Sequence, residues 1–175
     1  MTICHVLTFP ILVGFFAIFG TGGCSPRQAP RQNLNSQTES ITSIMSQAAE
    51  MQVQKAKVKY GVTLDYQPDS IQKVNTILGQ LHGQYLKSQD DKRWDTEGIG
   101  WGAYVGEVIR RKYGGEWAKE DKQIGQSLPL HWSKSTSFPV AWCVKRIRNG
   151  DEDNIWIKYQ MITSPEYDKM MKGQK

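Results

Sequence analysis

Apolar side chains recur every three or four residues in two segments of the first half of the chain, which is the spacing of one face of an α-helix. The first segment covers 38–60, with Thr38 as a candidate N-cap and Gly61 as a candidate stop. After a short extended stretch at 62–66, the second segment covers 68–88. Its apolar side chains follow steps of three and four residues, at Ile71, Val74, Leu78, Leu81 and Tyr85. Two amphipathic helices are therefore predicted here.

A third helical pattern covers about 95–113 and precedes a pair of glycines at 114–115 that favours its end. We interpret the charged run at 90–93 as the connection before this helix. Beyond the glycines the apolar runs become short, and 116–118 and 128–132 are typical of two strands joined by a polar loop. An antiparallel hairpin is predicted there.

The C-terminal part of the chain is again mostly helical in pattern. A helix over 138–149 carries three apolar residues on one face, Val140, Val144 and Ile147. Residues 155–162 alternate as a strand does but also form a helical face, and the acidic run 151–153 before them favours a helix. A short terminal helix begins at 164–165. We therefore predict an α+β fold, a single compact domain at 38–175 in which several amphipathic helices pack with a small antiparallel hairpin.

The N-terminus has the pattern of an export signal. Residues 6–19 are almost all apolar, but a bilayer-spanning helix needs about 20 such residues, so the run matches the core of a signal peptide at 1–23. It ends in Thr-Gly-Gly-Cys24, which resembles the lipobox of bacterial lipoproteins, whose cysteine receives a diacylglycerol. The resemblance implies that Cys24 is lipidated, that 24–37 is a flexible tether and that the domain is anchored to a membrane of the cell envelope. The alternative is a cleaved secretory signal in which Cys24 is incidental.

Charge and cysteine content limit the partners and the cross-links. The net charge is +5, and residues 1–23 carry none of it, so the exported part is basic. A basic excess suits a neighbouring anionic membrane and would also suit nucleic acid, but export argues against nucleic acid as a partner. If Cys24 is lipidated, Cys143 has no cysteine partner once Cys4 leaves with the signal; otherwise a Cys24–Cys143 disulfide becomes possible.

Glycines recur every fourth residue in the third helix, at Gly98, Gly102 and Gly106. Each costs about 1 kcal/mol of helix stability relative to alanine, and bare backbone on one face allows another element to approach closely. We interpret this stripe as a packing surface rather than a ligand site.

The same region resembles a family of small bacterial domains of unknown function. Members share a Gly-x-Tyr-x-Gly-Glu helix, here within 98–111, a tryptophan just beyond it, here Trp117, and a later Phe-Pro helix ending in Asn-Gly, here 138–150. The resemblance covers roughly 62–163. It implies a compact α+β domain and adds no activity.

Glu107 is the most prominent candidate for chemistry because it is a carboxylate on an otherwise apolar helix. Arg110 and Arg111 follow at three and four residues, within reach of it on one helical face. The group is either an ion pair that orders the helix end or a functional site, since both kinds of pair perturb a carboxylate.

The remaining reactive side chains give weaker signals. Cys143 could pair with His82 or His131 as a thiol–imidazole couple, but its position on an apolar helix face predicts a buried, inert thiol. The histidines have no metal-ligand spacing, so no metal or cofactor is predicted.

A basic cluster, Lys145, Arg146 and Arg148, lies beside Trp142. It is either a solvated helix end or a possible binding surface for anionic headgroups or an acidic protein. The sequence favours a non-enzymatic, envelope-anchored interaction domain that recognises a protein or an envelope component through this surface. The alternative is a small hydrolase-like enzyme that uses Glu107 with the two arginines after it.

Overall fold

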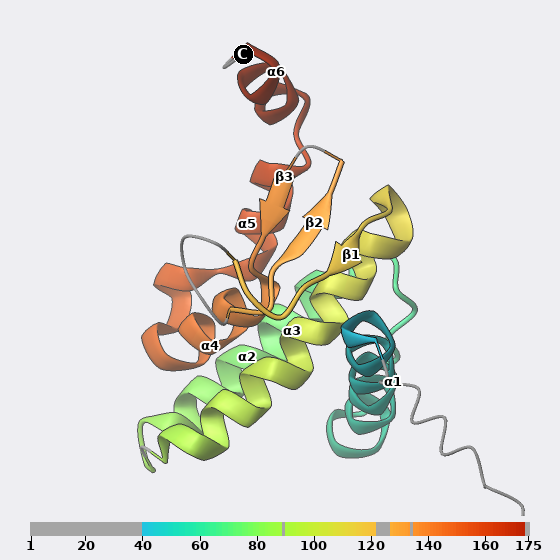
Figure 1. Ribbon diagram of the computed structural model, residues 1–175. Helices are drawn as coiled ribbons and strands as arrows, with labels where there is room; N and C mark the ends of the chain where they lie inside the picture. Colours follow the sequence, from blue (N-terminus) through green and yellow to red (C-terminus); the bar gives the residue numbers. More distant parts are fainter. Residues whose placement is uncertain (1–39, 89, 122–126, 134, 174–175) are drawn as a thin grey trace, which may run out of the picture. The chain divides into compact units, whose positions relative to one another are not determined.

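The computed structural model describes residues 40–88, 90–121, 127–133 and 135–173 (Figure 1). The predicted signal peptide, the tether with Cys24 and the candidate N-cap Thr38 lie outside these residues. The described residues belong to one unit with an α+β fold, in which helices pack against each other and beside a small three-stranded antiparallel sheet. The predicted fold class is confirmed.

Three long helices form the first half of the described chain, α1 (Ile41–Tyr60), α2 (Ser70–Tyr85) and α3 (Asp91–Tyr113). Ser40 caps α1 by accepting a hydrogen bond from the backbone N of Ser43 at 3.2 Å, and Gly61 ends the helix in the left-handed region with φ of 66°.

The start of α3 corrects one prediction. The charged run at 90–93 is not a connection: Asp90 is the N-cap, and its side chain accepts a hydrogen bond from the backbone N of Arg93 at 3.2 Å. An aspartate at this position satisfies a backbone N–H that has no partner inside the helix, so the helix begins at Asp91, before the apolar pattern does.

Four further helical segments follow among the described residues, α4 (Pro139–Asn149), the short 3₁₀ helix η1 (Gly150–Asp153), α5 (Ile155–Ile162) and α6 (Pro165–Gly173). The helix predicted at 155–162 is confirmed, but its cap is Asn154 rather than the acidic run, which forms η1. The Asn154 side chain accepts from the backbone N atoms of Trp156 and Ile157 at 3.0 and 3.2 Å.

The sheet has the order β1 (Glu116–Trp117), β2 (Leu130–Trp132) and β3 (Ser135–Ser137), all antiparallel. The first two strands confirm the predicted hairpin. The third strand was not predicted, because Ser-Thr-Ser has no apolar alternation. It is held instead by pairing with β2 and by a hydrogen bond of 2.7 Å from Nε1 of Trp132 to Oγ of Ser137.

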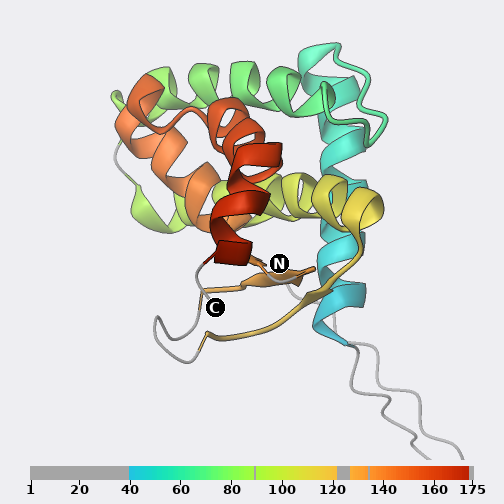
Figure 2. The same cartoon turned by 90° about the horizontal axis from the view of Figure 1, so that it is seen from above.

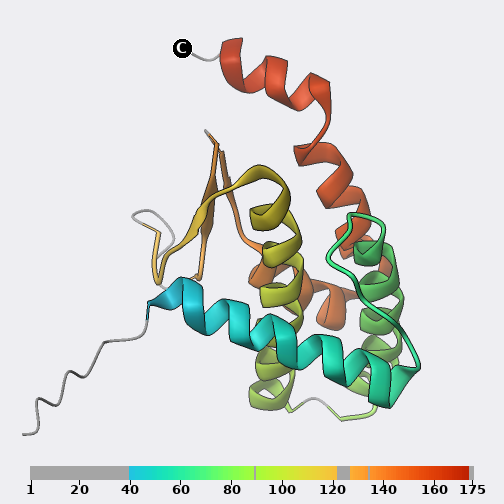
Figure 3. The same ribbon diagram turned by 90° about the vertical axis from the view of Figure 1, so that its right-hand side faces the viewer.

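Helix α3 is the centre of the fold. It lies between α1 and α4 in Figure 1, and between α2 and the sheet in Figure 2. Helix α1 runs across it in Figure 3. Every residue from Gly100 to Ile109 is buried, as expected for a helix that is covered on all sides.

Candidate functional site

Two glycines of α3 lie where α4 comes close to its backbone. A Cβ at Gly98 would lie 2.3 Å from Cγ2 of Val144, and a Cβ at Gly102 would lie 2.4 Å from Cα of Val140. Real Cβ atoms essentially never make such short contacts, so a side chain at either position would push α4 away. The interpretation of the glycine stripe as a packing surface is confirmed for this helix pair.

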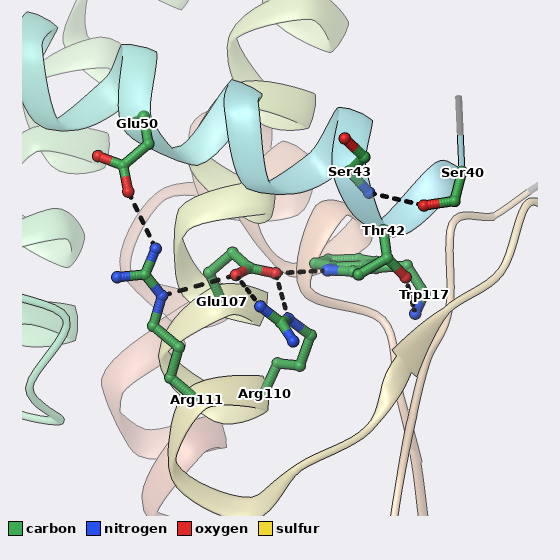
Figure 4. Close-up of polar contacts among 8 residues, drawn as sticks. All are labelled: Ser40, Thr42, Ser43, Glu50, Glu107, Arg110, Arg111 and Trp117. Atoms are coloured by element: carbon green, nitrogen blue, oxygen red, sulfur yellow. Dashed lines mark hydrogen bonds and ion pairs between the residues drawn. The ribbon is translucent and has the colours of Figure 1, made fainter. Parts of the chain in front are cut away.

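The third glycine of the stripe, Gly106, makes room for an aromatic ring. A Cβ there would lie 2.1 Å from Cζ2 of Trp117, the tryptophan of β1. Nε1 of this indole donates a hydrogen bond to Oε1 of Glu107 at 3.1 Å, and the backbone N of Trp117 donates to Oγ1 of Thr42 on α1 at 3.3 Å (Figure 4). The close approach therefore brings the indole N–H to the neighbouring carboxylate.

Glu107 has no exposed surface, and basic side chains hold its carboxylate. Arg110 donates from Nε to Oε1 at 2.7 Å and from Nη2 to Oε2 at 2.9 Å, which makes a bidentate ion pair (Figure 4). Nε of Arg111 lies 3.6 Å from Oε2. The structure thus brings together the three residues that the sequence singled out, and adds Trp117, which the spacing on the helix could not predict.

The pKa of Glu107 lies below its ordinary value of 4.5. Burial by itself would raise this pKa, because it disfavours the charged form. The hydrogen bonds from Arg110 and Trp117, together with the positive charge of Arg110, outweigh burial and lower the pKa. Glu107 is therefore an anion held by its neighbours.

Arg111 connects this buried pair to the surface. Its Nη2 atom lies 2.9 Å from Oε1 of Glu50 on α1 (Figure 4), and its guanidinium carbon lies 3.4 Å from the centre of the Tyr66 ring. It is therefore shared between two carboxylates and an aromatic ring.

This geometry gives no support to a hydrolase centred on Glu107. Both carboxylate oxygens accept hydrogen bonds, and the side chain has no contact with solvent through which a substrate could reach it. A general acid or base must come within hydrogen-bond reach of a substrate proton, and one with a pKa lowered by its partners is poorly suited to donate one.

Cys143 is buried with no exposed surface, and burial raises the pKa of its thiol. The two histidines contact other groups: Nδ1 of His82 lies 2.8 Å from the carbonyl oxygen of Ile147, and Nδ1 of His131 lies 3.0 Å from Oγ1 of Thr136. The prediction of a buried thiol is confirmed.

The predicted basic cluster does not form one surface. Arg146 is only 4% exposed, and it reaches back across α2, where a Cβ at Gly79 would lie 2.9 Å from its Nη2. Its guanidinium donates to Oδ1 of Asn75 at 3.1 Å and to Oδ1 of Asp151 at 2.6 Å. The predicted binding surface of Lys145, Arg146, Arg148 and Trp142 is therefore wrong as a set, because Arg146 lies in the interior.

The other three members of that cluster have different surroundings. Arg148 is engaged by two acidic side chains of α3, Asp95 at 2.7 Å and Asp91 at 3.1 Å. Trp142 is partly buried and packs against the core. Lys145 is exposed. Of the four residues, only Lys145 and Arg148 line the same groove.

The groove lies between α3 and α4, has a volume of about 570 Å³ and was not predicted from the sequence. Five of its lining residues are apolar and come from three segments of the chain, Ile99, Leu128, Val140, Ala141 and Val144. The other lining residues are polar or charged, namely Asp95, Ser127, Lys145, Arg148 and Asn149.

Ile99 is the lining residue of the groove that the sequence could have indicated. It is an apolar residue within the third predicted helix, yet 40% of it is exposed. Asp95 lies one turn before Ile99 on the same helical face, and a carboxylate there is the signal that this face reaches solvent. The groove itself depends on where α4 and residues 127–128 lie, which local spacing does not specify.

Two further properties of the described residues bear on function. They contain no group of His, Cys, Asp and Glu side chains that could hold a metal ion. None of their helices is both long enough and apolar enough to cross a membrane.

In comparisons with known proteins, no family model, no curated protein and no solved structure matches this chain. The resemblance to a family of small bacterial domains therefore stays a prediction.

Proposed function

We propose that this chain is a non-enzymatic binding domain, held at a membrane of the cell envelope by a lipid on Cys24, and that its partner binds in the groove between α3 and α4. The tether is supported by the apolar run at 6–19 and the small residues before Cys24. The binding role is supported by the groove.

The groove is the single observation that carries the binding role. Its volume of about 570 Å³ falls in the range of about 300–1,000 Å³ that is typical of ligand sites. Its lining combines apolar with polar side chains, which is the composition of sites that take up an apolar group and orient it by a few polar contacts. Ile99 would lose its contact with water when the groove is filled, so burial of its side chain would favour binding.

The test is a comparison of two isoleucines of almost equal exposure. Ile99 is 40% exposed and lines the groove, whereas Ile44 on α1 is 43% exposed and does not. A library of random short peptides is selected on the purified protein, and the enriched peptides are measured by fluorescence anisotropy on I99A and I44A. I99A removes three carbons, of whose surface the ligand would newly bury the 40% that is exposed; at about 0.8 kcal/mol per fully buried carbon this loss should weaken binding by about fivefold to tenfold. I44A should leave binding unchanged.

A second variant fills the groove instead of enlarging it. Ala141 lines the groove and is only partly buried, so Ala141→Trp should abolish binding while the protein remains folded. Circular dichroism and thermal unfolding check the fold of each variant. If the enriched peptides bind A141W and I99A as tightly as the wild type, the groove is not the binding site.

A further inference from the structure

Helix α1 carries a row of exposed apolar side chains on the side that faces away from the core. Ile44, Met51 and Val58 follow one another at steps of seven residues, which places them along one side of the helix, and 84% of Val58 is exposed. The buried side chains of α1, among them Met45 and Ala49, lie on its other side. Single exposed apolar residues are common on protein surfaces, but a row of them along a helix is typical of an interaction surface.

The charges of α1 leave two lysines beside this row. The other two charged residues of the helix, Glu50 and Lys55, are each paired with an oppositely charged side chain of α3. Lys57 and Lys59 are exposed and form no ion pair with a described residue, although Lys59 lies 5.3 Å from the centre of the next aromatic ring along the chain. They directly precede and follow Val58, so two positive charges flank the most exposed apolar residue of the row.

A second copy of this chain fits the row poorly. Two helices that pair along their length need apolar residues at two positions of every seven. The second position is held by Gln47 and Gln54 in one register, and by Ala48 and the paired Lys55 in the other. An anionic bilayer does not require a second row, because apolar side chains enter its interface while long lysine side chains reach back to the headgroups.

The place of α1 in the chain and in the fold also suits a membrane. Fewer than twenty residues separate Ile41 from the proposed anchor at Cys24, about 60 Å at full extension. Gly100 of α3 packs against α1, whereas Gly98 and Gly102 pack against α4, so these two helices lie on opposite sides of α3 (Figure 1). The groove between α3 and α4 is therefore on the far side of α3 from α1.

Resting on the lipid anchor of the proposed function, we propose that α1 docks on the surface of an anionic membrane. Ile44, Met51 and Val58 enter the interface, and Lys57 and Lys59 lie against the lipid phosphates. The anchor keeps α1 at a high local concentration near the bilayer, so a contact too weak to hold the free protein can form. Docking through α1 fixes the orientation of the anchored domain and leaves the groove open to a partner.

Two methionines of equal exposure make the test possible within one protein. Met51 on α1 is 64% exposed and Met161 on α5 is 63% exposed, and hydrogen peroxide converts an accessible methionine to its sulfoxide. The full chain is attached to vesicles of phosphatidylglycerol and phosphatidylcholine, and the oxidation rates of both residues are measured by peptide mass spectrometry. The reference is C24A protein in solution without vesicles.

We expect the two methionines to be oxidised at similar rates in solution, and Met51 to be oxidised severalfold more slowly than Met161 on the vesicles. The protection of Met51 should decrease on vesicles of phosphatidylcholine alone and at high salt. It should also be lost in K57E/K59E. The matched control is K87E/K119E, which changes two exposed lysines outside α1 and should retain the protection.

The anchor is tested separately by the mass of the purified chain. If Cys24 carries no lipid, the anchor of the proposed function is wrong, and docking is measured after a maleimide lipid is coupled to Cys24 of a C4S variant. Cys143 is buried and does not compete for this reagent.

Three outcomes would overturn the docking of α1. Equal oxidation of Met51 and Met161 on the vesicles would show that the membrane does not cover α1. Protection of Met51 in K57E/K59E as strong as in the wild type would exclude the proposed contact of the lysines with lipid phosphates. Protection of Met51 that appears in solution as the concentration of C24A protein rises would assign the row to a second copy of the chain.

Discussion

At the scale of single residues, Glu107 shows how one buried charge is made compatible with an apolar interior. Taking a carboxylate out of water is costly, and the cost is offset only when its oxygens are fully hydrogen-bonded and a cation is close. Arg110 supplies both conditions from the next turn of α3, and Trp117 adds an N–H from β1. The carboxylate thereby joins a helix to a strand that has only two residues.

We expect Glu107→Gln to lower the free energy of unfolding by about 1.5–3 kcal/mol at pH 7, the usual range for hydrogen bonds to a charged group. Because the pKa of Glu107 is lowered in the folded state, its charge stabilises the fold above the ordinary value of 4.5. This stabilisation should be lost as the pH falls from that value through the lowered pKa. Urea unfolding of both proteins between neutral and acidic pH measures the difference.

The difference in unfolding free energy between the wild type and E107Q is the informative quantity, because the contributions of the acidic residues that both proteins contain cancel. It should be largest at neutral pH and shrink toward zero in acid, where a protonated glutamate resembles glutamine. A difference that stays constant down to the acidic limit would show that Glu107 contributes packing rather than charge. If folded E107Q lost peptide binding, Glu107 would have a functional role besides its structural one.

At the scale of elements, the fold depends on how closely α4 and Trp117 approach α3. Glycine inside a helix is unfavourable relative to alanine by about 1 kcal/mol, so an alanine should stabilise α3 wherever there is room for it. At Gly102 there is none, since the added Cβ would meet Cα of Val140 at 2.4 Å. A backbone atom cannot rotate away as a flexible side chain can.

We therefore expect Gly102→Ala to destabilise the protein despite the better helix propensity of alanine, by about 1–3 kcal/mol as in other overpacked cores. The matched control is Gly83→Ala in α2, where nothing lies within 4 Å of the added Cβ. That variant should be more stable than the wild type by up to about 1 kcal/mol. Thermal and urea unfolding of the two variants give the comparison. Equal stabilisation by both would contradict the close approach of α4.

At the scale of the whole molecule, the proposed protein would combine a membrane tether with a binding groove. A lipid anchor confines the groove to the membrane surface and raises its effective concentration toward any partner held there. A single acyl chain anchors a protein only marginally, whereas the two chains of a diacylglycerol give stable attachment. The net charge of +5, all of which lies outside residues 1–23, would add attraction to anionic lipid.

Attachment should therefore depend on Cys24. We expect Cys24→Ala to move the protein from the membrane fraction to the soluble fraction and to stop incorporation of a labelled fatty acid. Cys143→Ala is the control, because this thiol is buried and its replacement leaves the anchor intact. Fractionation and labelling of the three proteins provide the measurement. Equal membrane association of wild type and C24A would refute lipidation at this cysteine.

Much of the secondary structure was predictable from the sequence, because the information lies within a few residues. The helices follow from apolar spacing and from caps such as Gly61, and the ion pair of Glu107 with Arg110 follows from a separation of three residues. The start of α3 was wrong by one turn, because Asp90 as an N-cap and Asp90 in a charged loop look the same in one sequence.

The tertiary structure alone decided which distant residues meet. The sequence indicated that another element approaches Gly102, but not that the contact is Val140. It also grouped Arg146 with Lys145. In the fold, Asn75 and Asp151 hold Arg146 in the interior. The third strand and the groove likewise have no local signal. Contacts between residues far apart in the sequence depend on how whole elements pack, and several packings satisfy the same local spacing, so only the assembled fold selects among them.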